Sequence, residues 1–345
     1  NILDTPGHQD FSEDTYRTLM AADSAVMVID ASKGVEAQTR KLFKVCVMRH
    51  IPIFTFINKL DREAKDTFEL LDDIEKELGI ATCPINWPIG SGKEFKGVYD
   101  RAKREVELFS DTKKGTAMGE VKMIPIDAPE TEELIGADAK DILADEIELL
   151  DGAAAEFDQE LVDKGQLSPV FFGSALTNFG VETFLKHFLK MTTSPLPRKS
   201  DHGEIDPMTE KDFSAFVFKI QANMNKAHRD RIAFMRICSG EFEAGMSVYH
   251  VQGGKDVRLS QPQQMMASER KMIDKAYGGD IIGVFDPGIF SIGDTLTTSK
   301  EKFAYEGIPT FAPEHFARVR QVDTMKRKQF VKGINQIAQE GAIQI

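Results

Sequence analysis

The sequence predicts an α/β protein in which a doubly wound parallel-sheet domain is followed by a small β-barrel and the start of an α+β domain. Three observations predict it. Apolar strands alternate with helical stretches over residues 1–195, which is typical of a parallel sheet covered by helices. Short strands separated by glycine turns follow over 210–303, as in a small barrel. A strand, a helix and a last strand then fit residues 310–345.

In the first domain, strands are expected at SAVMVIDA, IPIFTFIN and SPVFFGSA, with helices at 36–49 and 66–78. The opening residues, Asn1–Asp4, resemble the end of another apolar strand that leads through a turn into a helix. An insertion of short strands and acidic helices is expected from about 82 to 166. The stretch TTSPLPRKSDHGEIDPM combines proline, glycine and charge, and is therefore interpreted as a linker.

Four segments are predicted as barrel strands, namely FSAFVFKI, DRIAFMRI, MSVYHV and DIIGVF. The last part, 310–345, is interpreted as a truncated α+β domain of ferredoxin-like type, with its helix at about 324–340.

The composition limits the possible functions. A net charge of −12 in 345 residues argues against a nonspecific binder of DNA or other polyanions. Against this background RVRQVDTMKRKQFVKG is strongly basic, and either a solvated helix face or an RNA contact explains it. The acidic run DAPETEELIGADAKDILADEIELLDG is interpreted as solvated helix faces.

Zinc, disulfide and membrane sites find no support in the sequence. Cys46, Cys83 and Cys238 lie far apart, and the histidines follow no metal-ligand spacing. No apolar run approaches the ~18 residues that span a membrane. We therefore expect a cytoplasmic monomer without a membrane partner.

The first candidate motif is DTPGH, at the carboxyl end of the strand expected at the start of the chain. Open α/β sheets bind ligands at that edge. Asp4 can organise Mg²⁺ through water, and Gly7 allows a backbone N–H to approach a phosphate. Thr5 and Pro6 form the turn between them. His8 stands where a side chain could orient an attacking water.

The second motif is NKLD, after the strand IPIFTFIN. The carboxylate of Asp61 can accept hydrogen bonds from the N1–H and exocyclic amine of guanine, whereas adenine would leave it unpaired. Asn58 can bond the N7 side of the purine, and the stem of Lys59 can lie over the ring. Leu60 completes the loop.

The third motif, GSAL, follows the strand SPVFF. Here Ser174, Ala175 and Leu176 could present a backbone N–H to the guanine O6. The three motifs occur in this order, each after an apolar strand, and together they predict guanine-nucleotide binding.

DTPGHQDF, NKLDRE and GSAL resemble the third, fourth and fifth motifs of the translational GTPases. Nearly the whole chain is similar to one of their families, the bacterial class II release factors. This similarity is carried by INWPIGSGKEFKGVYDR, NKAHRDRIAFMRICSG and FAPEHFARVRQVDTMKRKQF. This resemblance implies GTP or GDP with Mg²⁺ as ligands, and the ribosome, including its RNA, as the activator that holds His8 in place for GTP hydrolysis. It also implies that the protein promotes dissociation of class I peptide chain release factors from the ribosome after peptide release.

Two alternatives stay open. One is a GTPase like elongation factor G or a ribosome-protection protein, and the other is a regulatory module that binds guanine nucleotide without hydrolysing it.

The chain departs from the family pattern because it contains no P-loop and no first switch. WPIGSGKEF is not a substitute, since Trp87 replaces the required glycine and Glu94 stands where Ser or Thr should bind Mg²⁺. We expect both elements upstream of Asn1, and therefore expect the chain as given to bind nucleotide weakly.

Overall fold

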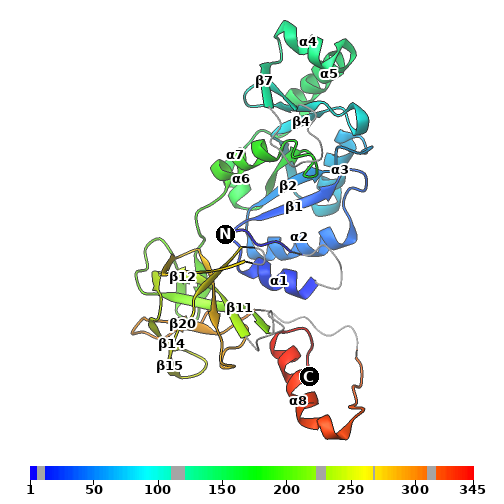
Figure 1. The fold of residues 1–345 in the computed structure, drawn as a ribbon. Helices are drawn as coiled ribbons and strands as arrows, with labels where there is room; N and C mark the ends of the chain where they lie inside the picture. The colour runs from blue at the N-terminus through cyan, green and yellow to red at the C-terminus, as the bar shows by residue number, and fades with distance from the viewer. Residues whose placement is uncertain (6–11, 110–120, 223–230, 267–268, 309–315) are drawn as a thin grey trace. The chain divides into compact units, whose positions relative to one another are not determined.

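A computed structural model describes residues 1–5, 12–109, 121–222, 231–266, 269–308 and 316–345 (Figure 1). These residues form two compact units. One consists of Asp23–Thr193, and the other combines Asn1–Ala22 with Ser194–Ile345. Each unit is described by itself.

A four-stranded parallel sheet is the centre of the first unit. Its strand order is β1 (Ala25–Asp30), β2 (Ile53–Asn58), β8 (Leu167–Phe172) and β3 (Ala81–Pro84). The strands β2 and β8 are buried almost throughout, as expected for a sheet covered on both faces. The strands predicted at SAVMVIDA, IPIFTFIN and SPVFFGSA are therefore confirmed.

Helices cover both faces of this sheet. α2 (Ala37–Arg49) and α3 (Thr67–Leu78) lie on one side, and α6 (Gln159–Asp163) and α7 (Val181–Met191) on the other (Figure 1). Phe184 and Phe188 of α7 pack edge-on against Phe54, Phe56 and Phe171 of the sheet, with ring centroids 4.9–5.4 Å apart. α3 begins as the sequence predicts, because the Asp66 side chain accepts hydrogen bonds from two backbone amides of its first turn.

The insertion between β3 and β8 folds as an antiparallel sheet with helices. Its strands, in the order in which they pair, are β4 (Asn86–Ile89), β5 (Gly97–Asp100), β6 (Glu105–Phe109) and β7 (Val121–Pro125). The helices α4 (Pro129–Ile135) and α5 (Ala137–Ala153) follow. β3, at the first residues of the predicted insertion, pairs with β8 in the parallel sheet, so the antiparallel sheet begins at Asn86.

The second unit is dominated by an eight-stranded antiparallel sheet, and its buried apolar residues form two clusters. Its strand order is β15-β14-β20-β11-β12-β19-β16-β17. The strands are β11 (Ser214–Ala222), β12 (Arg231–Ser239), β14 (Ser247–His250), β15 (Lys255–Arg258), β16 (Gln263–Met266), β17 (Glu269–Met272), β19 (Ile281–Phe285) and β20 (Thr295–Thr297). All four predicted barrel segments form strands of this sheet.

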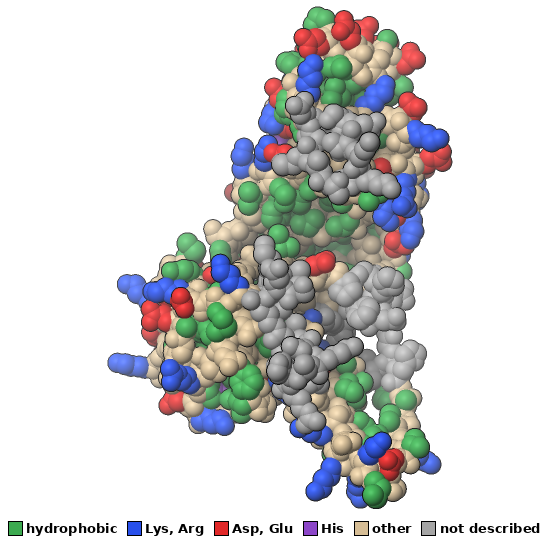
Figure 2. Space-filling model, viewed as in Figure 1, with side chains coloured by type: hydrophobic (Ala, Val, Ile, Leu, Met, Phe, Trp, Pro, Cys, Tyr) green, Lys and Arg blue, Asp and Glu red, His purple; other side chains and the backbone are tan. Residues whose placement is uncertain are grey.

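Shorter elements complete the second unit. They are α1 (Ser12–Met20), the paired strands β9 (Arg198–Ser200) and β10 (Gly203–Ile205), and the paired strands β13 (Glu241–Glu243) and β18 (Lys275–Tyr277). The short η4 turn (Thr324–Lys326) leads into α8 (Arg327–Gln339). Figure 2 shows Lys and Arg side chains around this helix, where the exposed basic residues are Arg318, Arg320, Lys326, Arg327, Lys328 and Lys332.

Three expected strands are absent among the described residues. Asn1–Asp4, 316–322 and 341–345 carry no strand. The helix predicted at about 324–340 is present as η4 and α8. A strand forms only where a neighbouring strand pairs with its backbone groups, and no described strand pairs with these three segments.

Candidate guanine-nucleotide site

Three loops follow the carboxyl ends of β1, β2 and β8. Because these strands are parallel and adjacent, their ends lie at the same edge of the sheet. The register pairs Asp30 with Asn58, and Ile57 with Phe172. The second and third sequence motifs, 58–61 and 173–176, are thereby brought together, although the insertion separates them in the chain.

Asn58 connects the loop after β2 to the loop after β8. Its Oδ1 accepts a hydrogen bond from the backbone N–H of Lys59 at 2.8 Å and from that of Ala175 at 2.9 Å. Since two amides contact the oxygen, the orientation of the side-chain amide is set. The Nδ2 amine is then the group that can donate to N7 of a purine.

Asp61 is held by the same neighbouring loop. The Oγ of Ser174 donates to Oδ1 of Asp61 at 2.5 Å, and the Asp61 side chain is 18% exposed. Arg62 Nε lies 3.9 Å from Oδ2. Ser174 thus restrains the carboxylate while leaving it accessible to a ligand.

Leu60 and Gly173 form the base of the site. Leu60 is buried, and its N–H donates to the carbonyl of Gly173 at 3.3 Å. Gly173 in turn donates to the carbonyl of Ile57 at 3.0 Å. A Cβ at Gly173 would lie 2.3 Å from the Phe179 carbonyl oxygen, so this position requires glycine.

The loop after β8 also closes on itself. Ser174 and Phe179 exchange two backbone hydrogen bonds, both at 2.9 Å. Leu176, between them, is 67% exposed. The Ser174 N–H donates to Phe179 and the Ala175 N–H to Asn58, so the structure pairs two of the three predicted O6 donors within the protein.

Lys59 is fixed at both ends. Its backbone is left-handed, with φ of 73°, and its Nζ donates to Oδ2 of Asp30 at 2.7 Å. Burial raises the pKa of Asp30, but hydrogen bonds from Lys59 and Ser32 outweigh that effect and lower it to about 2. The charged Asp30 therefore holds the ammonium group of Lys59, which leaves its methylene stem to lie against a base.

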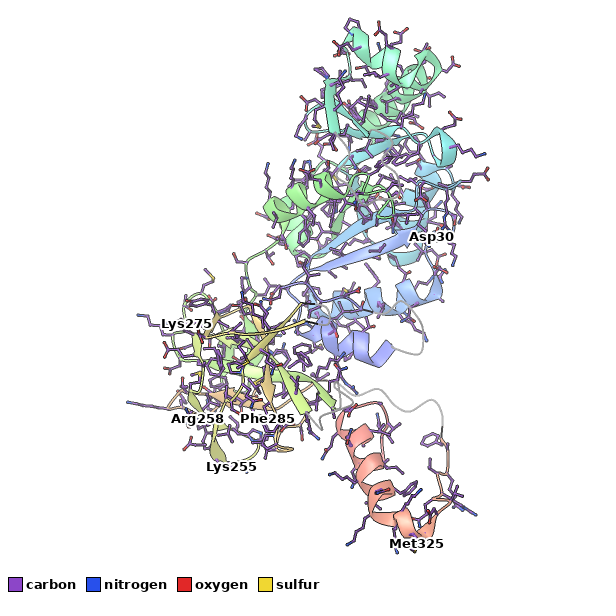
Figure 3. All side chains as sticks on the ribbon, in the orientation of Figure 1. Asp30, Lys255, Arg258, Lys275, Phe285 and Met325 are labelled. Atoms are coloured by element: carbon purple, nitrogen blue, oxygen red, sulfur yellow. The ribbon has the colours of Figure 1, made fainter. Side chains whose placement is uncertain are left out.

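Asp30 was not among the residues singled out from the sequence. It ends the apolar strand β1, just as Asn58 ends β2 (Figure 3). A polar residue at the carboxyl end of an apolar strand was therefore the available signal.

The residues of the first motif are placed differently. Asp4 and Thr5 belong to the other unit, and Asp4 is exposed. Pro6, Gly7 and His8 lie outside the described residues. WPIGSGKEF runs from the end of β4 into its connection with the antiparallel strand β5, which differs from the strand-to-helix turn of a P-loop. Among the described helices, none has the length and apolar character needed to cross a bilayer.

Family comparisons cover most of the chain. Residues 1–194 match the elongation factor Tu GTP binding domain, and residues 212–299 match elongation factor G domain 2. Residues 305–345 match the C-terminal domain of class II release factor RF3.

Similar proteins named peptide chain release factor 3 match all 345 residues. Those of Symbiobacterium thermophilum, Trichormus variabilis and Gloeobacter violaceus are 62%, 55% and 55% identical to this chain. The chain spans 65%, 64% and 65% of their respective lengths.

Proposed function

Because this chain belongs to the elongation factor Tu GTP-binding domain family and is similar along its whole length to peptide chain release factor 3, we propose that it is part of a ribosome-stimulated GTPase of translation termination. In this role the protein promotes dissociation of class I release factors from the ribosome after the peptide is released. It acts as a cytoplasmic monomer.

The observation that carries this proposal is the joined pair of loops 58–61 and 173–176. Ser174 orients the carboxylate of Asp61, which accepts hydrogen bonds from the N1–H and the exocyclic amine of guanine. Adenine has neither an N1–H nor an amine at the position where guanine carries one. A carboxylate left unpaired in the bound state costs about 1–3 kcal/mol or more. The geometry therefore supports selection of GTP and GDP over ATP.

Hydrolysis requires residues of the first motif. Mg²⁺, when bound, neutralises charge that develops on the phosphates. We assign Asp4 to Mg²⁺ through water, with Thr5, Pro6 and Gly7 forming the turn beside the γ-phosphate. His8 orients the attacking water when ribosomal RNA holds its imidazole in line.

The ribosome is also the expected partner of the basic surface formed by Arg318, Arg320, Lys326, Arg327, Lys328 and Lys332. These side chains are exposed, in a chain whose net charge is −12. Such a local patch can contact RNA phosphates while the rest of the surface repels them.

Two measurements on the full-length protein test this function. GTP hydrolysis is measured with and without ribosomes, and the residence time of a class I release factor is measured on ribosomes after peptide release. We expect ribosomes to stimulate hydrolysis and the GTP-bound protein to shorten that residence time. Hydrolysis without an effect on the release factor would favour a protein like elongation factor G, and binding without hydrolysis would favour a regulatory module.

A further inference from the structure

Two residues of the insertion, Asn86 and Gly92, hydrogen-bond to the backbone at the base of the two guanine-recognition loops. Neither residue belongs to a nucleotide motif. Asn86 starts β4, and Gly92 lies in the connection between β4 and β5. Their contacts link the insertion to the guanine site.

Asn86 replaces a strand partner at the end of β8. The backbone pairing of β3 with β8 reaches Val170, whose carbonyl accepts from the N–H of Ile85 at 2.9 Å. At the next outward position the side chain of Asn86 takes over. It accepts from the N–H of Phe172 at 2.7 Å and donates to the carbonyl of Phe172 at 3.1 Å.

Asn86 is fully buried, so both backbone groups of Phe172 would lose their partners if its side chain were apolar. Phe172 is two residues before Ser174, the residue that holds Asp61. The position of the Ser174 hydroxyl therefore depends on the hydrogen bonds made by Asn86.

Gly92 holds the backbone of the loop 58–61 in a similar way. Its N–H donates to the carbonyl of Leu60 at 2.8 Å, while the N–H of Leu60 donates to Gly173. The Leu60 backbone, directly before Asp61, is thus held on both sides. Gly92 has φ of +60°, and a Cβ there would lie 3.3 Å from the backbone nitrogen of Glu63. Close approach and backbone conformation both favour glycine.

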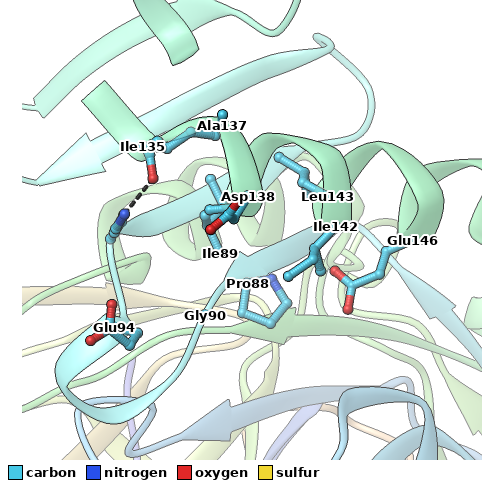
Figure 4. Close-up of a pocket in the computed structure, with 13 residues that line it drawn as sticks. Pro88, Ile89, Gly90, Glu94, Ile135, Ala137, Asp138, Ile142, Leu143 and Glu146 are labelled. Carbon is cyan, nitrogen blue, oxygen red and sulfur yellow. Dashed lines mark hydrogen bonds between the residues drawn. The ribbon is translucent and has the colours of Figure 1, made fainter. Parts of the chain in front are cut away.

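The contacts continue outward from β4. Trp87, next to Asn86, is fully buried and packs edge-on against Phe172, with ring centroids 5.3 Å apart. Its Nε1 donates to Oε2 of Glu146 on α5 at 2.9 Å. Figure 4 shows Glu146 on α5 facing Pro88–Gly90 across a cavity of about 440 Å³. The guanine loops are therefore packed, through β4, against the outer helix of the insertion.

We propose that Asn86 and Gly92 are positioning residues for guanine recognition, so that the insertion sets both the base selectivity and the dissociation rate of GDP. The inference rests on the proposed guanine-nucleotide function. It assigns to the insertion an action on the same site, exerted through the backbones of Phe172 and Leu60.

The test uses the full-length protein and two nucleotides, GDP and IDP. IDP lacks the exocyclic amine from which Asp61 accepts a hydrogen bond in GDP. The ratio of the affinities for GDP and IDP therefore reports how well Asp61 is placed. A protein that is only less stable binds both nucleotides less well in proportion, because its folded fraction is lower. A misplaced Asp61 lowers the ratio itself.

The variants are Asn86→Leu and Gly92→Ala, with Thr131→Val as the matched control. Thr131 is also a fully buried residue of the insertion, and its Oγ1 donates to the carbonyl of Pro125 at 2.8 Å. Asn86→Leu removes both hydrogen bonds to Phe172, and the Cβ of Gly92→Ala crowds the backbone of Glu63 beside the Leu60 contact. Each should speed GDP dissociation by about 10-fold, the size of effect expected when a buried hydrogen-bonding group loses its partner. Both should also reduce the preference for GDP over IDP, whereas Thr131→Val should change neither.

The outcomes separate the two proposals. If the unaltered protein shows no preference for guanine nucleotides, the proposed function fails. If it shows that preference and both variants keep its ratio and its dissociation rate, the positioning role is overturned. If Asn86→Leu does not fold, the result for Gly92→Ala alone decides whether the positioning role holds.

Discussion

The Oγ of Ser174 lies 2.5 Å from Oδ1 of Asp61, so the loop after β8 holds the carboxylate that the loop after β2 presents. Neither residue alone defines the site. In the proposed function Asp61 supplies the acceptor for the base, and Ser174 limits the rotation of its carboxylate. The first two predictions change one partner at a time.

Asp61→Asn should shift the preference of the full-length protein from guanine to xanthine nucleotides. The amide can donate to the 2-oxo group of xanthine, whereas the carboxylate only accepts from the amine of guanine. We expect the affinity for GDP to fall by at least ~100-fold, since a mismatched polar site rejects strongly. Competition binding with GDP and XDP measures the change, and an unaltered preference would remove Asp61 from the site.

Ser174→Ala should weaken GDP binding without reversing base preference. The carboxylate remains but loses one hydrogen bond to a charged acceptor, which is worth about 1.5–3 kcal/mol when fully buried and less here, where Asp61 is partly exposed. A roughly 5- to 10-fold loss of affinity is therefore expected by calorimetry. Ser174→Thr, which keeps the hydroxyl, is the control. Equal losses in both variants would assign the effect to packing.

His8→Ala should separate binding from chemistry. If His8 orients water only on the ribosome, GTP affinity should stay nearly constant while ribosome-stimulated hydrolysis falls by at least ~10²-fold, about 2.7 kcal/mol of transition-state stabilisation. Single-turnover phosphate release with and without ribosomes gives both values. Normal hydrolysis by the variant on ribosomes would exclude the role, and lost GTP binding would make His8 a structural residue.

The pair of Asp30 and Lys59 predicts an acid-dependent loss of stability. The pKa of Asp30 is lowered from 3.8 to about 2 in the folded protein. A carboxyl with a lowered folded-state pKa stabilises the fold above its unfolded pKa, and loses that contribution as the pH falls toward the folded value. The difference in free energy of unfolding between the protein and Asp30→Asn should thus be constant above about pH 5 and shrink between pH 4 and 2. Urea unfolding across pH 2–7 measures it, and a difference that persists at pH 2 would contradict the assignment.

The basic surface predicts a salt-dependent contribution to ribosome binding. Replacing Arg327 and Lys328 together by Gln should weaken binding and make it less sensitive to salt, because fewer counterions are released from RNA. Lys255→Gln with Lys300→Gln removes the same charge from exposed sites of the barrel unit and serves as the control. An equal effect of both double variants would indicate general attraction in place of a specific contact.

The sequence predicted the sheet and its loops because strong local signals coincided there. β2 and β8 are continuous apolar runs that end in polar residues, and parallel strands place such ends at one edge. The proximity of Asn58, Asp61 and Ser174 could therefore be predicted from the sequence.

Other features depend on pairing between distant segments. Asn86 and Gly92 contact Phe172 and Leu60 only in the folded protein, and no local pattern in NWPIGSG marks those contacts. Three segments were wrongly expected to be strands, namely Asn1–Asp4, 316–322 and 341–345, because apolar local sequence cannot reveal whether a pairing neighbour exists.

The insertion between the two guanine loops has a consequence for synthesis of the protein. Ser174 follows Asp61 by 113 residues, so the base-recognition contact is a long-range one that closes a large loop of chain. At a translation rate of about 5–20 residues per second, roughly 6–23 seconds pass between the addition of Asp61 and that of Ser174. During that interval a nascent chain has the carboxylate but lacks the hydroxyl that holds it. Under the proposed function, selective capture of guanine nucleotide becomes possible only after β8 has joined the sheet, and the nucleotide then stabilises chains that have completed this step.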